Sequence, residues 1–168
     1  ACVKEGYDTL CYLLKENWKP DFIITFEPSK AKIYSGYVSF DTIAEENRIP
    51  LYYVTSINSI DALNLLRDLN VDILYVIGWS EILKNYILKI PKIGTIGFHA
   101  SLLPKYRGSA PVNWALINNE PFTGSTMFWM DEKVDTGKII SQEKIEISSN
   151  DNCKDVYHKV AKVNAKMI

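Results

Sequence analysis

Short apolar runs alternate with amphipathic stretches over most of the chain. The runs are short enough to be buried strands, and they occupy residues 21–26, 51–54, 72–78 and 93–98. The stretches between them have apolar residues at helical spacing, at residues 4–17, 41–47, 59–69 and 80–88. Ser59 can cap the third of these helices by accepting a hydrogen bond from a free backbone amide. The alternation predicts an α/β fold with a Rossmann-like, mostly parallel twisted sheet and helices on both faces.

Polar loops interrupt this pattern at places where a ligand could bind. One loop, at residues 27–37, contains Pro28 and Gly36, and we expect it to face the ligand. The strand at residues 93–98 delivers His99 onto a second loop. The remaining expected elements are a helix at 112–118, a strand at 126–130, an acidic turn at 131–137, a strand at 138–147 and a helix at 151–167.

His99 and Asp135 follow two of the predicted strands. Loops at the carboxyl ends of strands are where open α/β sheets bind their ligands, so these side chains could form a proton-handling pair. Each also has a simpler interpretation. A lone His after an apolar strand is more often a structural residue, and an Asp before Thr136 and Gly137 favours a turn.

The two loops carry a long compound pattern, HASLLPKYRGSAPVNWALINN followed by TGSTMFWMDEKVDTGKII. This pattern resembles the formyltransferases that use 10-formyltetrahydrofolate, which include methionyl-tRNA, glycinamide ribonucleotide and nucleotide-sugar N-formyltransferases. The resemblance covers residues 51–147. It implies transfer of a formyl group from 10-formyltetrahydrofolate to a primary amine, with a nucleotide-linked amino sugar as the expected acceptor. The alternatives are a methionyl-tRNA formyltransferase and a catalytically impaired paralogue that binds folate or a nucleotide sugar.

The family has a catalytic trio of an Asn, a His two positions later and an Asp on the second loop. By resemblance, His99 donates to the oxyanion of the tetrahedral intermediate. Asp135 orients the imidazole, favours its protonated form and helps to move the amine proton. Gly97 stands where the family has Asn. Loss of one preorganised oxyanion donor typically costs about 10²- to 10³-fold in turnover, so the enzyme is weakened, inactive or supplied with another donor. The candidates for a replacement donor are Asn113 and Ser101.

The resemblance also implies binding residues around this pair. The folate would lie between two loops. Trp79 could line this folate site or, equally, fill the core. The expected folate-binding residues are Gly78, Trp79, Glu81, Ile82, Leu83, Ser101, Leu102, Leu103, Pro104, Asp131, Glu132, Lys133 and Val134. The expected acceptor-binding residues are Tyr106, Arg107 and Ser109, since a planar guanidinium suits a phosphate. For Tyr106 and Arg107 a solvated loop tip is an equal alternative.

Composition narrows the partners. The chain has 168 residues, of which 47% are hydrophobic, and a net charge of −1. No dense Lys/Arg cluster is present, which argues mildly against a tRNA acceptor and makes nucleic acid an unexpected partner. Cys2, Cys11 and Cys153 lack the spacing of a zinc site or a disulfide framework, so we expect no metal and a reducing, cytoplasmic environment. No apolar run has the length of a membrane helix. A homodimer is a candidate assembly.

The resemblance also bears on domain organisation. The family begins with a strand and a Gly-rich turn before its first helix, and its tRNA enzyme carries a further C-terminal domain. We therefore expect residues 1–168 to be a formyltransferase catalytic domain that lacks the first strand and any C-terminal domain.

Overall fold

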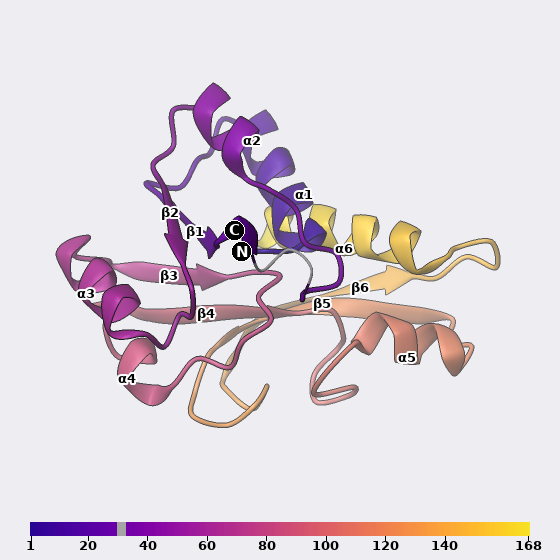
Figure 1. The fold of residues 1–168 in the computed structure, drawn as a ribbon. Coiled ribbons are helices and arrows are strands. Elements are labelled where there is room, and N and C mark those ends of the chain that lie inside the picture. Colours follow the sequence, from indigo (N-terminus) through magenta and orange to yellow (C-terminus); the bar gives the residue numbers. More distant parts are fainter. Residues whose placement is uncertain (30–32) are drawn as a thin grey trace.

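The computed structural model describes residues 1–29 and 33–168, which form an α/β fold (Figure 1). Residues 30–32, part of the expected polar loop at 27–37, lie outside the described residues. In chain order the elements are α1 (Lys4–Lys15), β1 (Ile23–Phe26), α2 (Asp41–Glu46), β2 (Leu51–Val54), α3 (Ile60–Asp68), β3 (Ile73–Val76), α4 (Asn85–Leu88), β4 (Gly94–His99), α5 (Pro111–Ile117), β5 (Phe122–Trp129), β6 (Ile139–Glu146) and α6 (Cys153–Met167).

The strands form a parallel pair and a mixed sheet. β1 pairs in parallel with β2, and β3 pairs in parallel with β4. β5 and β6 extend the second sheet in antiparallel orientation, giving the order β3-β4-β5-β6. The predicted α/β class is therefore confirmed, with the parallel pairings in the first four strands and the antiparallel ones in the last two.

Helices cover both faces of β1. Ile23 packs into a cluster with residues of α1 and α2, including Leu10 and Ile43. The next residue, Ile24, packs into another cluster, which contains Leu66 of α3 and residues of α4. Successive side chains of a strand point to opposite faces, so the two clusters lie on opposite sides of the strand. Figure 1 shows α1 and α2 on one side of the β1–β2 pair and α3 and α4 on the other.

A cavity separates the two sheets. It has a volume of about 620 Å³ and is lined by residues of both β1 and β3. Among the described residues, β1 pairs only with β2, and β3 pairs only with β4. The hydroxyl of Thr25, in β1, is buried without a hydrogen-bond partner among the described residues. Each of the two strands therefore keeps an unpaired edge.

Local signals explain most element boundaries. The hydroxyl of Ser59 accepts a hydrogen bond from the amide of Ala62 at 3.1 Å, as the capping prediction requires. The helix expected at residues 80–88 is shorter, because the carboxylate of Glu81 accepts a hydrogen bond from the amide of Ile57 and holds this segment outside the helix. His99 is the last residue of β4, where a loop position was expected. Among the described residues, no helix is long and apolar enough to cross a membrane.

Candidate active site

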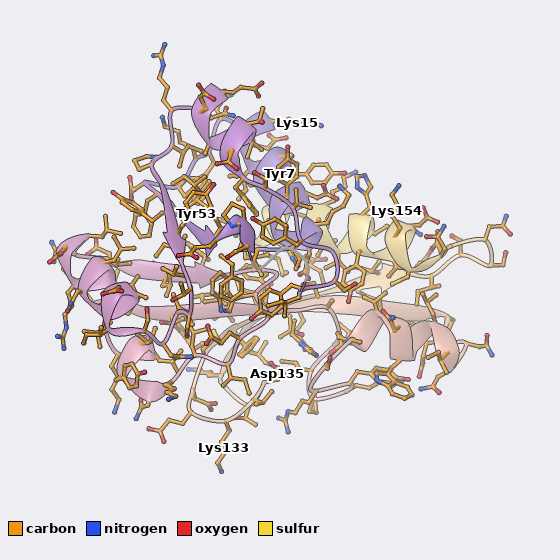
Figure 2. The ribbon with its side chains drawn as sticks, viewed as in Figure 1. Tyr7, Lys15, Tyr53, Lys133, Asp135 and Lys154 are labelled. Carbon is orange, nitrogen blue, oxygen red and sulfur yellow. The ribbon has the colours of Figure 1, made fainter. Side chains whose placement is uncertain are left out.

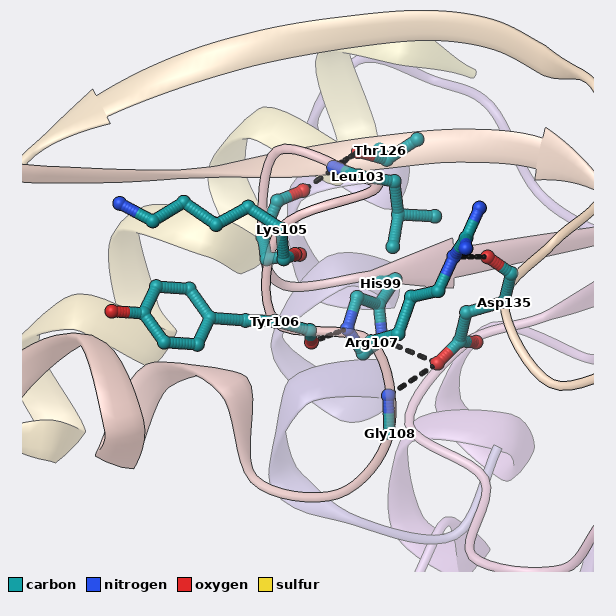
Figure 3. A network of polar contacts seen from close by, with 9 residues as sticks. His99, Leu103, Lys105, Tyr106, Arg107, Gly108, Thr126 and Asp135 are labelled. Carbon is teal, nitrogen blue, oxygen red and sulfur yellow. Dashed lines mark hydrogen bonds and ion pairs between the residues drawn. The ribbon is translucent and has the colours of Figure 1, made fainter.

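His99 and Asp135, the two residues that the sequence suggested as a pair, lie in contact. His99 closes β4 and is only 8% exposed, and Asp135 lies on the loop that follows β5. Nδ1 of His99 is 3.5 Å from Oδ2 of Asp135 (Figure 3). Nε2 of His99 lies 2.6 Å from the carbonyl oxygen of Tyr106, so Nε2 is the donor in that contact. Both ring nitrogens are therefore engaged, and a ligand that binds Nε2 must displace the Tyr106 carbonyl.

The loop after β5 clamps the loop after β4. Oδ2 of Asp135 accepts a hydrogen bond from the amide of Gly108 at 2.9 Å, and its backbone carbonyl accepts one from Nε of Arg107 at 2.8 Å. Asp135 has φ 53°, a left-handed conformation that Asp tolerates better than most residues. Gly137 is required here, because a Cβ at this position would lie 1.6 Å from the carbonyl oxygen of Trp129. The backbone thus fixes where the Asp135 carboxylate points.

Beneath this contact, the loop after β4 is anchored to the sheet. The hydroxyl of Ser101 donates to the carbonyl of Lys105 at 2.6 Å, and the carbonyl of Ser101 accepts from Thr126 at 2.6 Å. Leu103 is buried, and its amide donates to the Thr126 hydroxyl at 3.1 Å. The Leu102 side chain lies against Gly124 of β5. Three of the expected folate-binding residues, Ser101, Leu102 and Leu103, thus make contacts that hold the loop in place. The fourth, Pro104, is exposed.

A cavity of about 1750 Å³ opens next to His99 and Asp135. Its lining joins both walls of the predicted folate site with Ser109, Asn113, and Ser35 and Gly36 of the loop after β1. Lys133 projects from the loop after β5 into solvent (Figure 2). The predicted wall residues that line the cavity are Gly78, Trp79, Glu81, Ile82, Leu83, Asp131, Glu132, Lys133 and Val134.

Trp79 and Tyr106 have structural contacts that their sequence context did not reveal. The Trp79 ring stacks on Phe26 with centroids 4.1 Å apart, so it fills the core while also lining the cavity. Its Nε1 is buried without a partner among the described residues. The Tyr106 hydroxyl donates to Glu120 at 2.7 Å, and its ring points away from Asp135 (Figure 3). Of the expected acceptor residues, Tyr106 and Arg107 thus build the loops, and Ser109 faces the cavity.

Gly97 is buried in β4 beside the cavity. A Cβ at this position would lie 2.8 Å from Cγ and 3.1 Å from Sδ of Met130, and 3.0 Å from Cζ of Phe128. The Met130 thioether therefore occupies space that a larger residue at position 97 would need. Of the replacement donors, Ser101 is committed to Lys105, whereas Asn113 lines the cavity.

Asn113 is held in a way that leaves a donor free. Asn113 is exposed, and its Oδ1 accepts a hydrogen bond from Sγ of Cys153 at 3.2 Å. Its amide nitrogen has no hydrogen-bond acceptor among the described residues. Within the same described ranges, no group of three or more His, Cys, Asp or Glu side chains could hold a metal ion.

The sequence reasoning missed Glu5, a carboxyl group on the cavity wall. It lies in the first turn of α1, where acidic residues are common because they complement the helix dipole. Its position in the sequence therefore carried no functional signal.

Comparison with known proteins places this chain in a family. Residues 22–168 match the formyl transferase family, and the chain belongs to it. It is 39% identical over 155 residues to the bifunctional polymyxin resistance protein ArnA of Wigglesworthia glossinidia brevipalpis, covering 92% of this chain and 24% of that protein. It is 34% identical over 159 residues to the methionyl-tRNA formyltransferase of Clostridioides difficile, covering 93% of this chain and 51% of that enzyme.

A solved structure supports the fold. The crystal structure of WlaRD, a sugar 3N-formyl transferase, superimposes with a TM-score of 0.65 and 24% identity, covering 99% of this chain and 57% of that one. The chain spans about a quarter of the length of the ArnA relative and about half that of the methionyl-tRNA formyltransferase.

Proposed function

We propose that this chain transfers a formyl group from 10-formyltetrahydrofolate to a primary amine. The observation that carries the proposal is the His99–Asp135 contact beside a cavity whose walls hold the expected folate segments. Membership of the formyl transferase family supports it. So does the WlaRD structure, which was determined with 5-N-formyl-THF.

The site suits attack of an amine on a formyl carbon. The amine nitrogen forms a bond to that carbon, and the carbonyl electrons move to oxygen. The attacking nitrogen loses a proton, and the oxygen electrons re-form the carbonyl. The C–N10 bond breaks, and N10 takes a proton as tetrahydrofolate leaves. His99 can donate to the oxyanion once the ligand replaces the Tyr106 carbonyl at Nε2. Asp135 keeps the ring in place through Nδ1.

Asn113 is the residue best placed to replace the missing family carboxamide. It lines the same cavity as His99, and Cys153 orients it with the amide nitrogen uncommitted. An amide donor within reach of the reacting carbonyl can stabilise developing negative charge. The site thus keeps two candidate donors for the oxyanion despite Gly97.

For the acceptor we propose a nucleotide-linked amino sugar. WlaRD, a sugar 3N-formyl transferase crystallised with dTDP, supports this choice. The net charge of −1 also fits a small acceptor better than tRNA. Methionyl-tRNA is the second candidate, favoured by the Clostridioides difficile relative. A paralogue that binds without turnover is the third, because Met130 fills the space beside Gly97.

One assay distinguishes these three candidate functions. The protein is incubated with 10-formyltetrahydrofolate and either a panel of nucleotide-linked amino sugars or methionyl-tRNA, and formylated products are measured by mass spectrometry. Formylated sugar supports the proposal, and formylated tRNA alone replaces it with the second candidate. Tight folate binding by calorimetry without any product identifies a binding paralogue.

A further inference from the structure

Glu5 places a second carboxyl group on the wall of the cavity that holds His99. It lies at the start of α1, and the cavity is also lined there by Val3 and Asp8. Formyl transfer as described above uses no residue of α1. This side of the cavity is therefore available for the acceptor, with the expected folate segments forming other walls.

A buried network sets the orientation of Glu5. Oε1 of Glu5 accepts a hydrogen bond from Nδ2 of Asn164 at 3.0 Å. Oδ1 of Asn164 accepts one from the hydroxyl of Ser125 at 2.5 Å. Asn164 and Ser125 are fully buried, so the Asn164 amide is fixed with its nitrogen toward the carboxyl group. The network links α1, α6 and β5 and positions one polar group at the cavity.

Glu5 has no cationic partner among the described residues. Lys4 pairs with Asp8 at 2.7 Å, and Lys159 pairs with Asp151. Burial raises the pKa of Glu5 to about 7, and the hydrogen bond from Asn164 offsets part of that effect. A group that titrates there can accept and release a proton near neutral pH.

The surroundings of Glu5 leave this titration available. On α6, Tyr157 stays protonated, because burial and then the charge of Glu5 raise its pKa to about 12. The other titratable groups on the cavity wall come from α1, α6, β4 and the loops after β3, β5 and β6. They are Lys4, Asp8, Asp151, Cys153, Lys154, Asp155, His158, Lys159, His99, Glu81, Asp131, Glu132, Lys133 and Asp135.

We propose that Glu5 is the base that takes a proton from the ammonium group of the acceptor before formyl transfer. An ammonium nitrogen has no free electron pair, so it must lose a proton to attack. Asp135 is a poorer base, because its Oδ2 already accepts from Gly108 and faces His99. In the step, an ammonium N–H bond breaks, its electron pair stays on nitrogen, and the proton adds to the Glu5 carboxylate. The proton passes to solvent after the products leave.

The inference rests on the proposed function, since it requires an amine acceptor. Its test compares wild type with Glu5→Gln, which keeps an oxygen for Asn164 but cannot accept the proton. Glu16→Gln is the matched control, because Glu16 is an exposed carboxylate that caps the same helix at its other end. The measured quantity is the ratio of kcat/KM in wild type to that in each variant, from pH 5.5 to 8.5. Ionisation of the acceptor and of His99 affects numerator and denominator alike and cancels.

For Glu5→Gln the ratio should rise about tenfold per pH unit at low pH and level off above a pH of about 7, at roughly 10²-fold or more. For Glu16→Gln it should stay near one. A ratio for Glu5→Gln that does not change with pH would overturn the assignment, whatever its size, because a structural defect lowers activity equally at all pH values. Wild type that formylates no amine would instead overturn the proposed function, and with it this role of Glu5.

Discussion

Gly97→Asn restores the family residue, yet we expect it to destabilise this protein. The new Cβ would lie 2.8 Å from Cγ of Met130 and 3.0 Å from Cζ of Phe128, closer than side chains normally approach. The carboxamide would extend further into the same space. Since Met130 is flexible and only partly buried, it can move, but only by leaving its present packing.

The expected cost is that of an overpacked core, about 1–3 kcal/mol of unfolding free energy. For a domain of this size that corresponds to a fall in Tm of roughly 2–12 °C, at about 2–4 °C per kcal/mol. Met130→Ala alone should also destabilise, because it removes buried apolar contacts. Combined with Gly97→Asn it should cost less than the two single changes together, by about 1–2 kcal/mol, since it empties the space that the carboxamide needs.

The assay is a double-mutant cycle measured by urea denaturation, with Gly97→Ala as a control that adds the Cβ without the amide. Formyl transfer is measured in parallel. If the carboxamide acts as in the family, the double variant should gain turnover, by up to about 10²-fold. A Gly97→Asn variant as stable as wild type, or a cycle with no coupling to Met130, would refute the steric reasoning.

Three further outcomes are expected. Asn152→Ala should lower the unfolding free energy by about 1 kcal/mol in urea denaturation, since it removes the capping box of α6; an unchanged value would contradict this. Below pH 4.5 Glu5 is protonated in both the folded and the unfolded protein. Between pH 4.5 and a pH of about 7 it stays protonated only in the folded protein. Stability should therefore fall by about 3 kcal/mol across this window, and Glu5→Gln should abolish that slope; parallel curves for both proteins would count against it. A strand of alternating apolar residues fused before Ala1 should fill the cavity between β1 and β3 and raise Tm, whereas a Pro-rich extension of equal length should not; equal Tm values would argue against a strand site.

Local patterns predicted the strand at residues 51–54 and the Ser59 cap because each depends on neighbouring residues. The start of β5 was missed. Its first residues include Thr123 and Ser125, which read as polar but are buried, one bonded to the Ala100 carbonyl and the other to Asn164. Hydropathy cannot reveal polar residues whose partners lie elsewhere in the fold.

The candidate site was likewise predictable only in part from the sequence. The motifs predicted only that His99 and Asp135 follow two strands that could bring them together. These strands are antiparallel and end at opposite edges, so the contact is made by the loop after β5. The contact of His99 with the Tyr106 carbonyl and the packing of Met130 beside Gly97 depend on loop geometry and tertiary packing. Residue types alone could not predict either.

The most direct test of the account is formyl transfer by wild type, His99→Ala and Asp135→Asn to the best acceptor of the panel. Asp72→Asn serves as the control, because Asp72 is an exposed carboxylate that pairs with Lys92 and does not line the cavity beside His99. The account predicts a loss of about 10²-fold or more in kcat for His99→Ala, a clear loss for Asp135→Asn and wild-type rates for the control. Wild-type rates in folded His99→Ala would contradict it, because the formyl group would then be transferred without the residue on which the proposed site is built.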